Sequence, residues 1–339
     1  MTAGGKRNRT GSFVRLLLVG GPVALILLLV PEVADPYQTQ LLTYGLVFAI
    51  AALGFNLLLG YTGLLSFGHS AYFGMGAYTV GFLVRDLGVV SMEAAIAGGV
   101  VGSMLVSALF GYVCVRHTRI FFAVLTLALS QVLWSLAFKF FWITGGTDGI
   151  RVPQLALLGG LIDFSGNGAY LRFIISYYYY VLAFFLVSVA VMWLIVQSPF
   201  GKTLQSIRDN ETRARFLGIE IRRYRWVAFV ISGTFTGLAG ALWVPLNGLT
   251  TPDILWWPFS GEIVFMSVLG GFRSFAGPLV GAVVFNFLKA YAVASTEYWQ
   301  MLLGIVLIAL VLALPGGIVG GLAKLSLRIR VRKSDEAMT

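Results

Sequence analysis

Long apolar stretches alternate with short polar segments along almost the whole chain. Each apolar stretch has about 18 or more mainly apolar residues, which is the length that an α-helix needs to cross a bilayer. Alternating segments of about ten residues, which are typical of a transmembrane β-barrel, are not evident. The pattern predicts an all-α, polytopic membrane protein of about eight to ten transmembrane helices, some short or interrupted by glycine.

The apolar segments can be placed in order along the chain. We expect spans over 16–30, 41–59, 60–84, 94–115, 120–143, 170–196 and 226–249, two shorter elements within 261–293, and a last span over 299–314. The segment 60–84 is rich in glycine, so it is either tightly packed through small residues or broken where it lines a cavity. The glycines at Gly233, Gly237 and Gly240 predict a close-packing helix face, and Tyr177–Tyr180 is expected near a membrane interface.

The longest polar run is Ser198–Arg225, between the sixth and seventh predicted spans. It carries seven of the 24 Lys and Arg residues of the chain. Apolar residues recur in it at helical spacing (Phe200, Leu204, Ile207 and Phe216–Leu217), which predicts a short amphipathic helix. A bilayer protein has little reason to make a loop this long unless a partner docks there. We therefore interpret the run as a segment that receives force from a partner.

Composition and charge agree with this topology. The chain is 58% hydrophobic and 11% charged, whereas soluble domains have about 25% charged residues. The net charge of +10 reflects the positive-inside rule rather than nucleic-acid binding, because 19 of the 24 basic residues fall in segments assigned to the cytoplasm. We expect a cytoplasmic basic N-terminus at 1–15, a transmembrane domain at 16–323 that includes the cytoplasmic loop 198–225, and a cytoplasmic tail at 324–339.

Nucleotide, metal and enzyme sites find little support in the sequence. Gly201-Lys202-Thr203 looks like the end of a phosphate-binding loop, but the glycine that such a loop needs five residues earlier is Val196. If ATP drives this protein, another chain hydrolyses it. Two histidines and one cysteine form no metal-ligand spacing and no nucleophile–base set. We expect no metal, no cofactor and no catalytic residue.

Small polar side chains cluster around the glycines of the second and third predicted spans. They are Asn56, Thr62, Ser66, His69, Ser70 and Tyr72. We interpret them as a path for a zwitterionic or polar solute along a water-filled seam. The alternative is that they are hydrogen-bond partners between helices, with the His69 ring bonded to Ser66 or Ser70. The acid–base pair that a proton-coupled carrier needs at mid-span is not evident, since Glu262, the one acid in a late span, is placed near an interface.

Three blocks of sequence resemble the branched-chain amino acid ABC transporter permeases. Gly54–Thr79 is similar to the signature segment of that family. TGGTDGI, at Thr144–Ile150, looks like the outside loop of the LivM-type subunit, one of two paralogous permeases. Ser198–Ile219 resembles the cytoplasmic coupling segment. The blocks lie in matching order, and the resemblance covers nearly all of the chain.

The resemblance implies a permease subunit that imports leucine, isoleucine, valine or related amino acids across the bacterial inner membrane, with both termini in the cytoplasm. The implied partners are two ATP-binding cassette ATPase subunits, a second paralogous permease in a heterodimer, an extracytoplasmic solute-binding protein and membrane lipid, without nucleic acid. The implied ATPase-coupling residues are Arg208, Glu211, Ala214, Leu217 and Gly218. The alternatives are a permease for urea or short-chain amides and a stand-alone secondary transporter.

Overall fold

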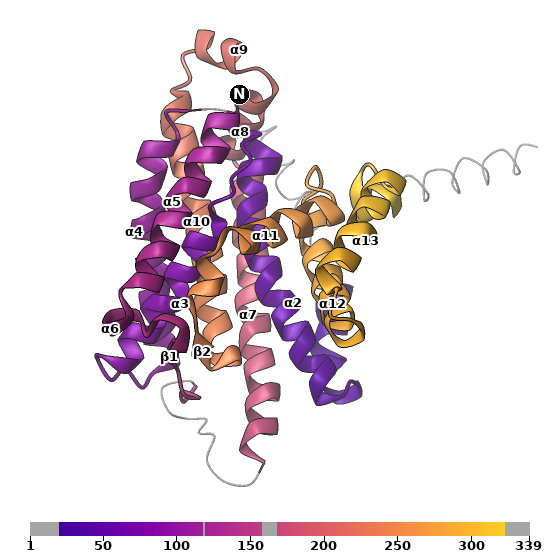
Figure 1. Cartoon of the computed structure of the whole chain (residues 1–339). Helices are drawn as coiled ribbons and strands as arrows, with labels where there is room; N and C mark the ends of the chain where they lie inside the picture. Colours follow the sequence, from indigo (N-terminus) through magenta and orange to yellow (C-terminus); the bar gives the residue numbers. More distant parts are fainter. Residues whose placement is uncertain (1–19, 118, 158–167, 323–339) are drawn as a thin grey trace, which may run out of the picture.

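The computed structural model describes residues 20–117, 119–157 and 168–322, and most of them are helical (Figure 1). Among the described residues, seven helices are long and apolar enough to cross a membrane. They are α2 (Pro36–Asn56) with the π-helix η1 (Leu57–Thr62) that extends it, α4 (Met92–Cys114), α5 (Arg119–Lys139), α7 (Ala169–Gln197), α10 (Ile221–Asn247) and α12 (Gly277–Ser295). The last is the segment Trp299–Leu322, which begins with α13 (Trp299–Ala313).

Three shorter helices complete this set, and they are Gly20–Val33, α3 (His69–Arg85) and α11 (Trp257–Gly270). Of the three segments expected to be short or interrupted by glycine, α3 and α11 are short, whereas α12 is long enough to span a membrane. The all-α, polytopic fold class is confirmed. The predicted basic N-terminus 1–15 and the tail 324–339 lie outside the described residues.

The bundle is organised around α2 and α10. The apolar window of α2 is 83% buried within the chain, whereas that of the last span is only 17% buried. A helix that is apolar on all sides has no solvent face and is stable only when its neighbours or lipid surround it. α10 packs against α2, α3 and α4, and α2 packs in addition against α7 and α12. α12 and α13 lie to one side of this core, and α4 and α5 to the other (Figure 1).

Glycines bring the core helices into backbone contact. A Cβ added at Gly76 of α3 would overlap the carbonyl oxygen of Gly237 on α10, and one at Gly240 would overlap the carbonyl oxygen of Phe73. At Gly237, an added Cβ would overlap the Ser103 side chain of α4. In a membrane the hydrophobic effect does not drive helices together, because lipid tails are as apolar as the helices. Transmembrane helices therefore often associate through small residues that let their backbones approach closely. The predicted close-packing face on α10 is confirmed.

The predicted third span, 60–84, is divided at its start. α2 continues through η1 to Thr62, and α3 begins only at His69. Gly63 takes a left-handed conformation (φ 72°), and the Leu64 N–H donates to the Leu58 carbonyl, so the helix terminates there. Residues 63–68, which we call the strap, are neither helix nor strand. The expectation that this segment is broken is therefore confirmed, but its first residues belong to the second span.

A small sheet lies at the end of the molecule opposite α8 and α9 (Figure 1). β1 (Ile150–Arg151) pairs antiparallel with β2 (Leu249–Thr250), and α6 (Phe141–Thr144) and the 3-10 helices Gly146–Asp148 and Pro252–Leu255 flank it. The pairing ties the loop that carries TGGTDGI to the end of α10.

Two tyrosines of the α7 cluster join α7 to neighbouring helices. Tyr177 and Tyr178 are fully buried within the protein. The Tyr177 hydroxyl donates to the Leu242 carbonyl of α10 at 2.8 Å, and the Tyr178 hydroxyl donates to the Leu27 carbonyl of the first described helix. A buried tyrosine in a span is stable where its hydroxyl finds a carbonyl on a neighbouring helix.

Candidate functional site

The segment between α7 and α10, residues 198–220, contains two helices rather than the single one predicted. α8 (Pro199–Asp209) and α9 (Glu211–Phe216) are separated by Asn210. The Asn210 backbone is extended (φ −158°, ψ 99°), and its Oδ1 accepts a hydrogen bond from the Arg213 N–H at 2.8 Å. This residue caps α9 and breaks the helix. The prediction of one amphipathic helix was therefore wrong. We call residues 198–220 the polar loop.

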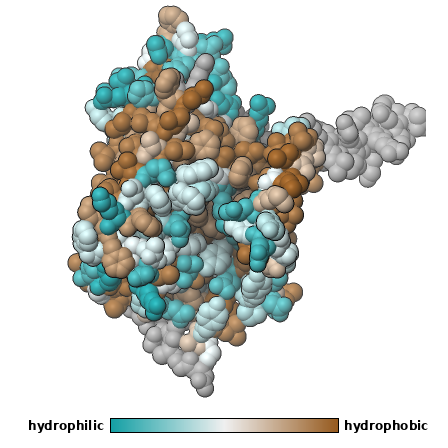
Figure 2. All heavy atoms as spheres, in the orientation of Figure 1, coloured by the Kyte–Doolittle hydropathy of each residue, from teal (hydrophilic) through white to brown (hydrophobic). Residues whose placement is uncertain are grey.

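The boundary of the polar loop also differs from the prediction. α10 begins at Ile221, so Arg222, Arg223 and Arg225 belong to the first turns of α10 and not to the loop. Hydrophilic residues gather at the end of the molecule that carries α8 and α9, beyond a hydrophobic band (Figure 2). The loop is thus the polar end of a long apolar body.

α8 lies against the bundle through its apolar face. Leu204 and Ile207 are buried, and a Cβ at Gly201 would overlap the carbonyl oxygen of Val196 at the end of α7. Lys202 and Thr203 occupy helical positions in the same first turn, where the Thr203 hydroxyl donates to the Pro199 carbonyl. The Gly-Lys-Thr triplet is part of a helix here and not of a loop that wraps a phosphate.

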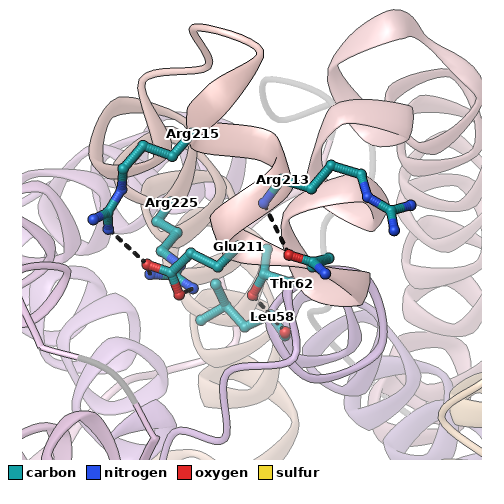
Figure 3. Close-up of polar contacts among 7 residues, drawn as sticks. Leu58, Thr62, Glu211, Arg213, Arg215 and Arg225 are labelled. Carbon is teal, nitrogen blue, oxygen red and sulfur yellow. Dashed lines mark hydrogen bonds and ion pairs between the residues drawn. The ribbon is translucent and has the colours of Figure 1, made fainter.

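Glu211 fastens α9 to α10. Its Oε2 lies 2.9 Å from Arg225 Nη2 and its Oε1 lies 3.3 Å from Arg225 Nη1, so the contact is two-pronged. The Arg225 side chain is only 7% exposed, whereas that of Glu211 is 36% exposed. Arg215 approaches the same carboxylate from the solvent side at 3.5 Å (Figure 3). A planar guanidinium and a carboxylate form such pairs with fixed geometry.

Arg208 fastens α8 to the end of α2. Its Nη1 donates to the Gly60 carbonyl at 2.5 Å, and a Cβ at Gly63 would lie 2.9 Å from its Cγ. Its Nε and Nη2 donate to the neighbouring Asp209 carboxylate at 3.0 and 2.9 Å. Arg208 therefore reaches the end of α2 through Nη1, while the rest of its guanidinium stays at the exposed surface beside Asp209.

The remaining predicted coupling residues divide between the interior and the surface. Ala214 is buried against Ile207 and Ile221, whereas Leu217 is 74% exposed. Gly218 has a left-handed backbone (φ 79°) with open space around it. Phe216, which the site prediction omitted, is 87% exposed beside Leu217. We call Phe216–Leu217 the apolar tip.

Arg225 is the second residue that the site prediction missed. It was counted among the basic residues of the loop but was not assigned a role. Its carboxylate partner lies 14 positions away in sequence. The signal that was available is its place directly before a long apolar run, where a cation that enters the bundle needs a partner.

The predicted substrate-path residues surround the break between α2 and α3. His69 is fully buried, and its Nε2 lies 2.8 Å from Ser232 Oγ on α10 in a hydrogen bond. The Ser70 N–H donates to Ser260 Oγ on α11 at 2.8 Å, and the Ser260 hydroxyl donates to Ser70 Oγ at 2.9 Å. The bond to Ser232 reaches another helix, which is a partner that was not predicted. We call Ser66, His69, Ser70, Ser232 and Ser260 the serine–histidine cluster.

Aromatic rings enclose this cluster. The His69 ring meets Phe55 at a centroid distance of 4.9 Å and Tyr72 at 5.7 Å, both edge to face. Tyr72 is 1% exposed, and Ser66 is fully buried, where its Oγ accepts from the Gly68 N–H. The cluster is therefore sealed from solvent in this conformation.

Asn56 and Thr62 lie on the other side of the break, on α2 and η1. The Thr62 hydroxyl donates to the Leu58 carbonyl of its own helix at 2.6 Å (Figure 3). The Asn56 side chain is 1% exposed, and neither its Nδ2 nor its Oδ1 has a hydrogen-bond partner among the described residues; the same holds for His69 Nδ1. Buried polar atoms without partners cost free energy, so these positions suit a polar guest or a water molecule.

An ion pair within the late helices was not predicted. Lys289 Nζ on α12 lies 2.6 Å from Glu262 Oε1 and 2.7 Å from Glu262 Oε2 on α11. The same Nζ lies 5.5 Å from the centre of the Trp299 ring at the start of α13. The prediction concerned a pair at mid-span and placed Glu262 near an interface. It did not identify this contact, because the two residues are 27 positions apart and meet only through helix packing. No group of three or more His, Cys, Asp or Glu side chains that could hold a metal is found in the described ranges.

Comparison with known proteins covers both candidate sites. A family model described as "branched-chain amino acid transport system / permease component" matches residues 37–311. The high-affinity branched-chain amino acid permease protein LivM of Escherichia coli K12 is 26% identical, over 87% of this chain and 74% of that protein. LivH of Salmonella typhimurium is 24% identical, over 82% and 92%, and the L-arabinose permease AraH of Azospirillum brasilense is 27% identical, over 82% and 78%.

Proposed function

Because this chain belongs to the family of permease components of branched-chain amino acid transport systems, we propose that it forms half of the membrane pathway of an ABC importer for leucine, isoleucine, valine or related amino acids. It is a multi-pass inner-membrane protein and a transport subunit, not an enzyme. ATP hydrolysis belongs to separate subunits, and a paired permease supplies the other half of the pathway.

The observation that carries the proposal is the polar loop. Its two helices are held firmly on the bundle by Arg208 and Glu211, yet it exposes the apolar tip at the polar end of the molecule. Two large apolar side chains exposed side by side mark a surface for a protein partner. The partner we propose is an ATPase subunit, one for each permease of the pair, and this end of the molecule then faces the cytoplasm with both chain termini.

The mechanism follows from this attachment. Closure of the ATPase pair upon ATP binding moves the polar loops of both permeases, and the rigid helices below them turn from an outward-facing to an inward-facing arrangement. The sealed serine–histidine cluster, with the unpartnered polar atoms of Asn56 and His69, provides neutral hydrogen-bonding groups for a zwitterion when the seam opens. An extracytoplasmic binding protein delivers the solute and supplies most of the selectivity, as the L-arabinose relative of similar identity suggests.

The complex itself offers the most direct test. The chain is purified from membranes in mild detergent, the co-purifying proteins are identified, and their ATP hydrolysis is measured with a leucine-loaded binding protein. We expect two ATPase subunits, a second permease and stimulated hydrolysis. Stimulation by urea, an amide or a sugar in place of leucine would keep the transporter class and overturn the substrate. A chain that purifies alone and moves solute without ATP is a secondary transporter.

Gly218→Arg tests the docking surface. The side chain would enter open space beside the apolar tip at a left-handed backbone position, so we expect normal membrane insertion and loss of uptake. Gly88→Arg is the matched control, since Gly88 also has a left-handed backbone (φ 63°) and open space but lies in the turn between α3 and α4. Equal uptake by the two variants contradicts the docking assignment.

His69→Ala tests the solute path. The change removes the hydrogen bond to Ser232 and enlarges the sealed cluster. We expect leucine uptake to fall more than the amount of protein in the membrane. A parallel loss of both quantities shows that His69 only holds α3 against α10.

A further inference from the structure

The polar loop is attached to the bundle at two points, and the two attachments reach different helices. Arg208 binds the Gly60 carbonyl in η1, at the end of α2. Glu211 binds Arg225 in the first turns of α10. Movement of one attachment relative to the other therefore moves α2 relative to α10.

The polar loop has a natural pivot between these attachments. Asn210 is the single residue between α8 and α9, and its extended backbone interrupts the helical hydrogen bonding. A single non-helical residue is the kind of position that absorbs a change of φ and ψ in hinge motions. α8 with Arg208 and α9 with Glu211 are thus two rigid helices connected by one hinge residue.

The two helices that α8 and α9 hold meet again deeper in the bundle. From η1 the strap (residues 63–68) leads directly to His69, the first residue of α3. From Arg225, α10 runs for seven residues, about 10 Å, to Ser232. His69 and Ser232 are hydrogen-bonded at 2.8 Å. α8 is therefore linked to His69 through η1 and the strap, and α9 is linked to Ser232 through α10.

The end of α2 is a π-helix, a form that can be compared with the ordinary α-helix. A π-helix such as η1 contains i→i+5 hydrogen bonds, and π turns occur often at functional sites. Return to α-helical bonding would shift the residues after it by about one position, or about 1.5 Å along the axis. Arg208 binds a carbonyl inside this turn and packs on Gly63 just after it. Its contact favours the present state of the turn.

We propose that Arg208 and Arg225 are positioning residues that convert movement of α8 relative to α9 into separation of His69 from Ser232. The inference rests on the proposed function, because the ATPase subunits must move the polar loop. Arg208 then acts within the permease, not on the ATPase surface. It holds the α2 end and the strap, and its release from Gly60 frees the serine–histidine cluster to open.

The test uses the complete transporter in lipid vesicles, with leucine uptake and ATP hydrolysis measured together. Arg208→Met keeps the length of the side chain but removes the bond to Gly60. We expect assembly and hydrolysis to remain while the leucine carried per ATP hydrolysed falls about tenfold. Lys202→Met, which removes an exposed cation from the same helix, leaves that ratio unchanged. If Arg208→Met does not accumulate, Arg208→Lys, which keeps the stem against Gly63, is measured by the same criteria.

A double substitution separates this role from a merely structural one. Ser232→Ala alone should also lower the transport ratio. Because Arg208 acts through the His69–Ser232 contact, Arg208→Met should lower it no further in the Ser232→Ala background. Losses that multiply, or an unchanged ratio in Arg208→Met, overturn the inference. If the unmodified transporter shows no ATP-dependent leucine uptake, both the proposed function and this inference fail. If the unmodified transporter works and the Arg208 variants carry as much leucine per ATP as it does, only this inference fails.

Discussion

Within the described residues, the pairs Glu211–Arg225 and Glu262–Lys289 each join two helices, and they differ in which partner is buried. In the polar loop, the Arg225 side chain is 7% exposed and its partner Glu211 is 36% exposed. Between α11 and α12, Lys289 is 31% exposed and Glu262 is 19% exposed. The first pair has a buried guanidinium beneath a half-exposed carboxylate, whereas both members of the second are partly buried.

The difference predicts how each pair responds to the loss of one partner. A guanidinium keeps its proton in proteins, so Arg225 without Glu211 is a buried charge with no counter-charge. Both members of the second pair retain some access to solvent, so either can be hydrated when its partner is lost. The loop pair is therefore the more sensitive of the two, and the α11–α12 pair depends more on the packing beneath it.

The largest loss of stability is expected where the packing of α11 on α12 is disturbed. A Cβ at Gly281 of α12 would overlap the Met266 carbonyl oxygen of α11, so Gly281→Ala forces the two helices apart. We expect a loss of about 3 kcal/mol of stability and a clear drop in the melting temperature in detergent. Gly261→Ala, where an added Cβ meets nothing within 4 Å, is the control. Equal melting temperatures for the two variants would show that α11 and α12 do not need this close approach.

The second-largest loss of stability is expected on removal of Glu211. Glu211→Ala leaves Arg225 buried without its carboxylate, and we expect a loss of about 2 kcal/mol, with faster proteolysis of the polar loop. Glu220→Ala is the matched control, because Glu220 pairs with Arg223 at 2.6 Å but both side chains are mostly exposed. Such exposed pairs contribute about 0–1 kcal/mol. A loss in Glu220→Ala as large as in Glu211→Ala contradicts the argument from burial.

The smallest effect is expected at the pair in the late helices. Lys289→Met should cost about 1 kcal/mol, and the double variant Lys289→Met with Glu262→Gln should recover most of it, since no unpaired charge remains. Thermal unfolding of the single and double variants measures both values. A double variant that is less stable than either single one shows that the charges themselves hold α11 and α12 together.

Part of the candidate site could be predicted from local patterns. The polar loop stands out because its polarity and basic charge interrupt an apolar chain, and the all-α fold follows from the length of the apolar runs. The break before α3 was signalled by the glycines around Ser66 and His69. The partner of His69 was not predictable, because Ser232 lies 163 positions away and only the packing of α3 on α10 brings it near.

The amino-acid sequence by itself determined which segments enter the membrane, where they are interrupted and where the partner-facing loop lies. These features depend on residues that are neighbours along the chain, so composition and spacing specify them. Only the tertiary structure decided that Arg208 binds Gly60, that Glu211 binds Arg225, that Tyr177 is buried, and that Glu262 meets Lys289. The reason is that an apolar helix has the same sequence pattern whether lipid or another helix surrounds it. Which helices pack against it depends on glycine-rich faces and polar groups that fit together, and these come from segments far apart in the chain.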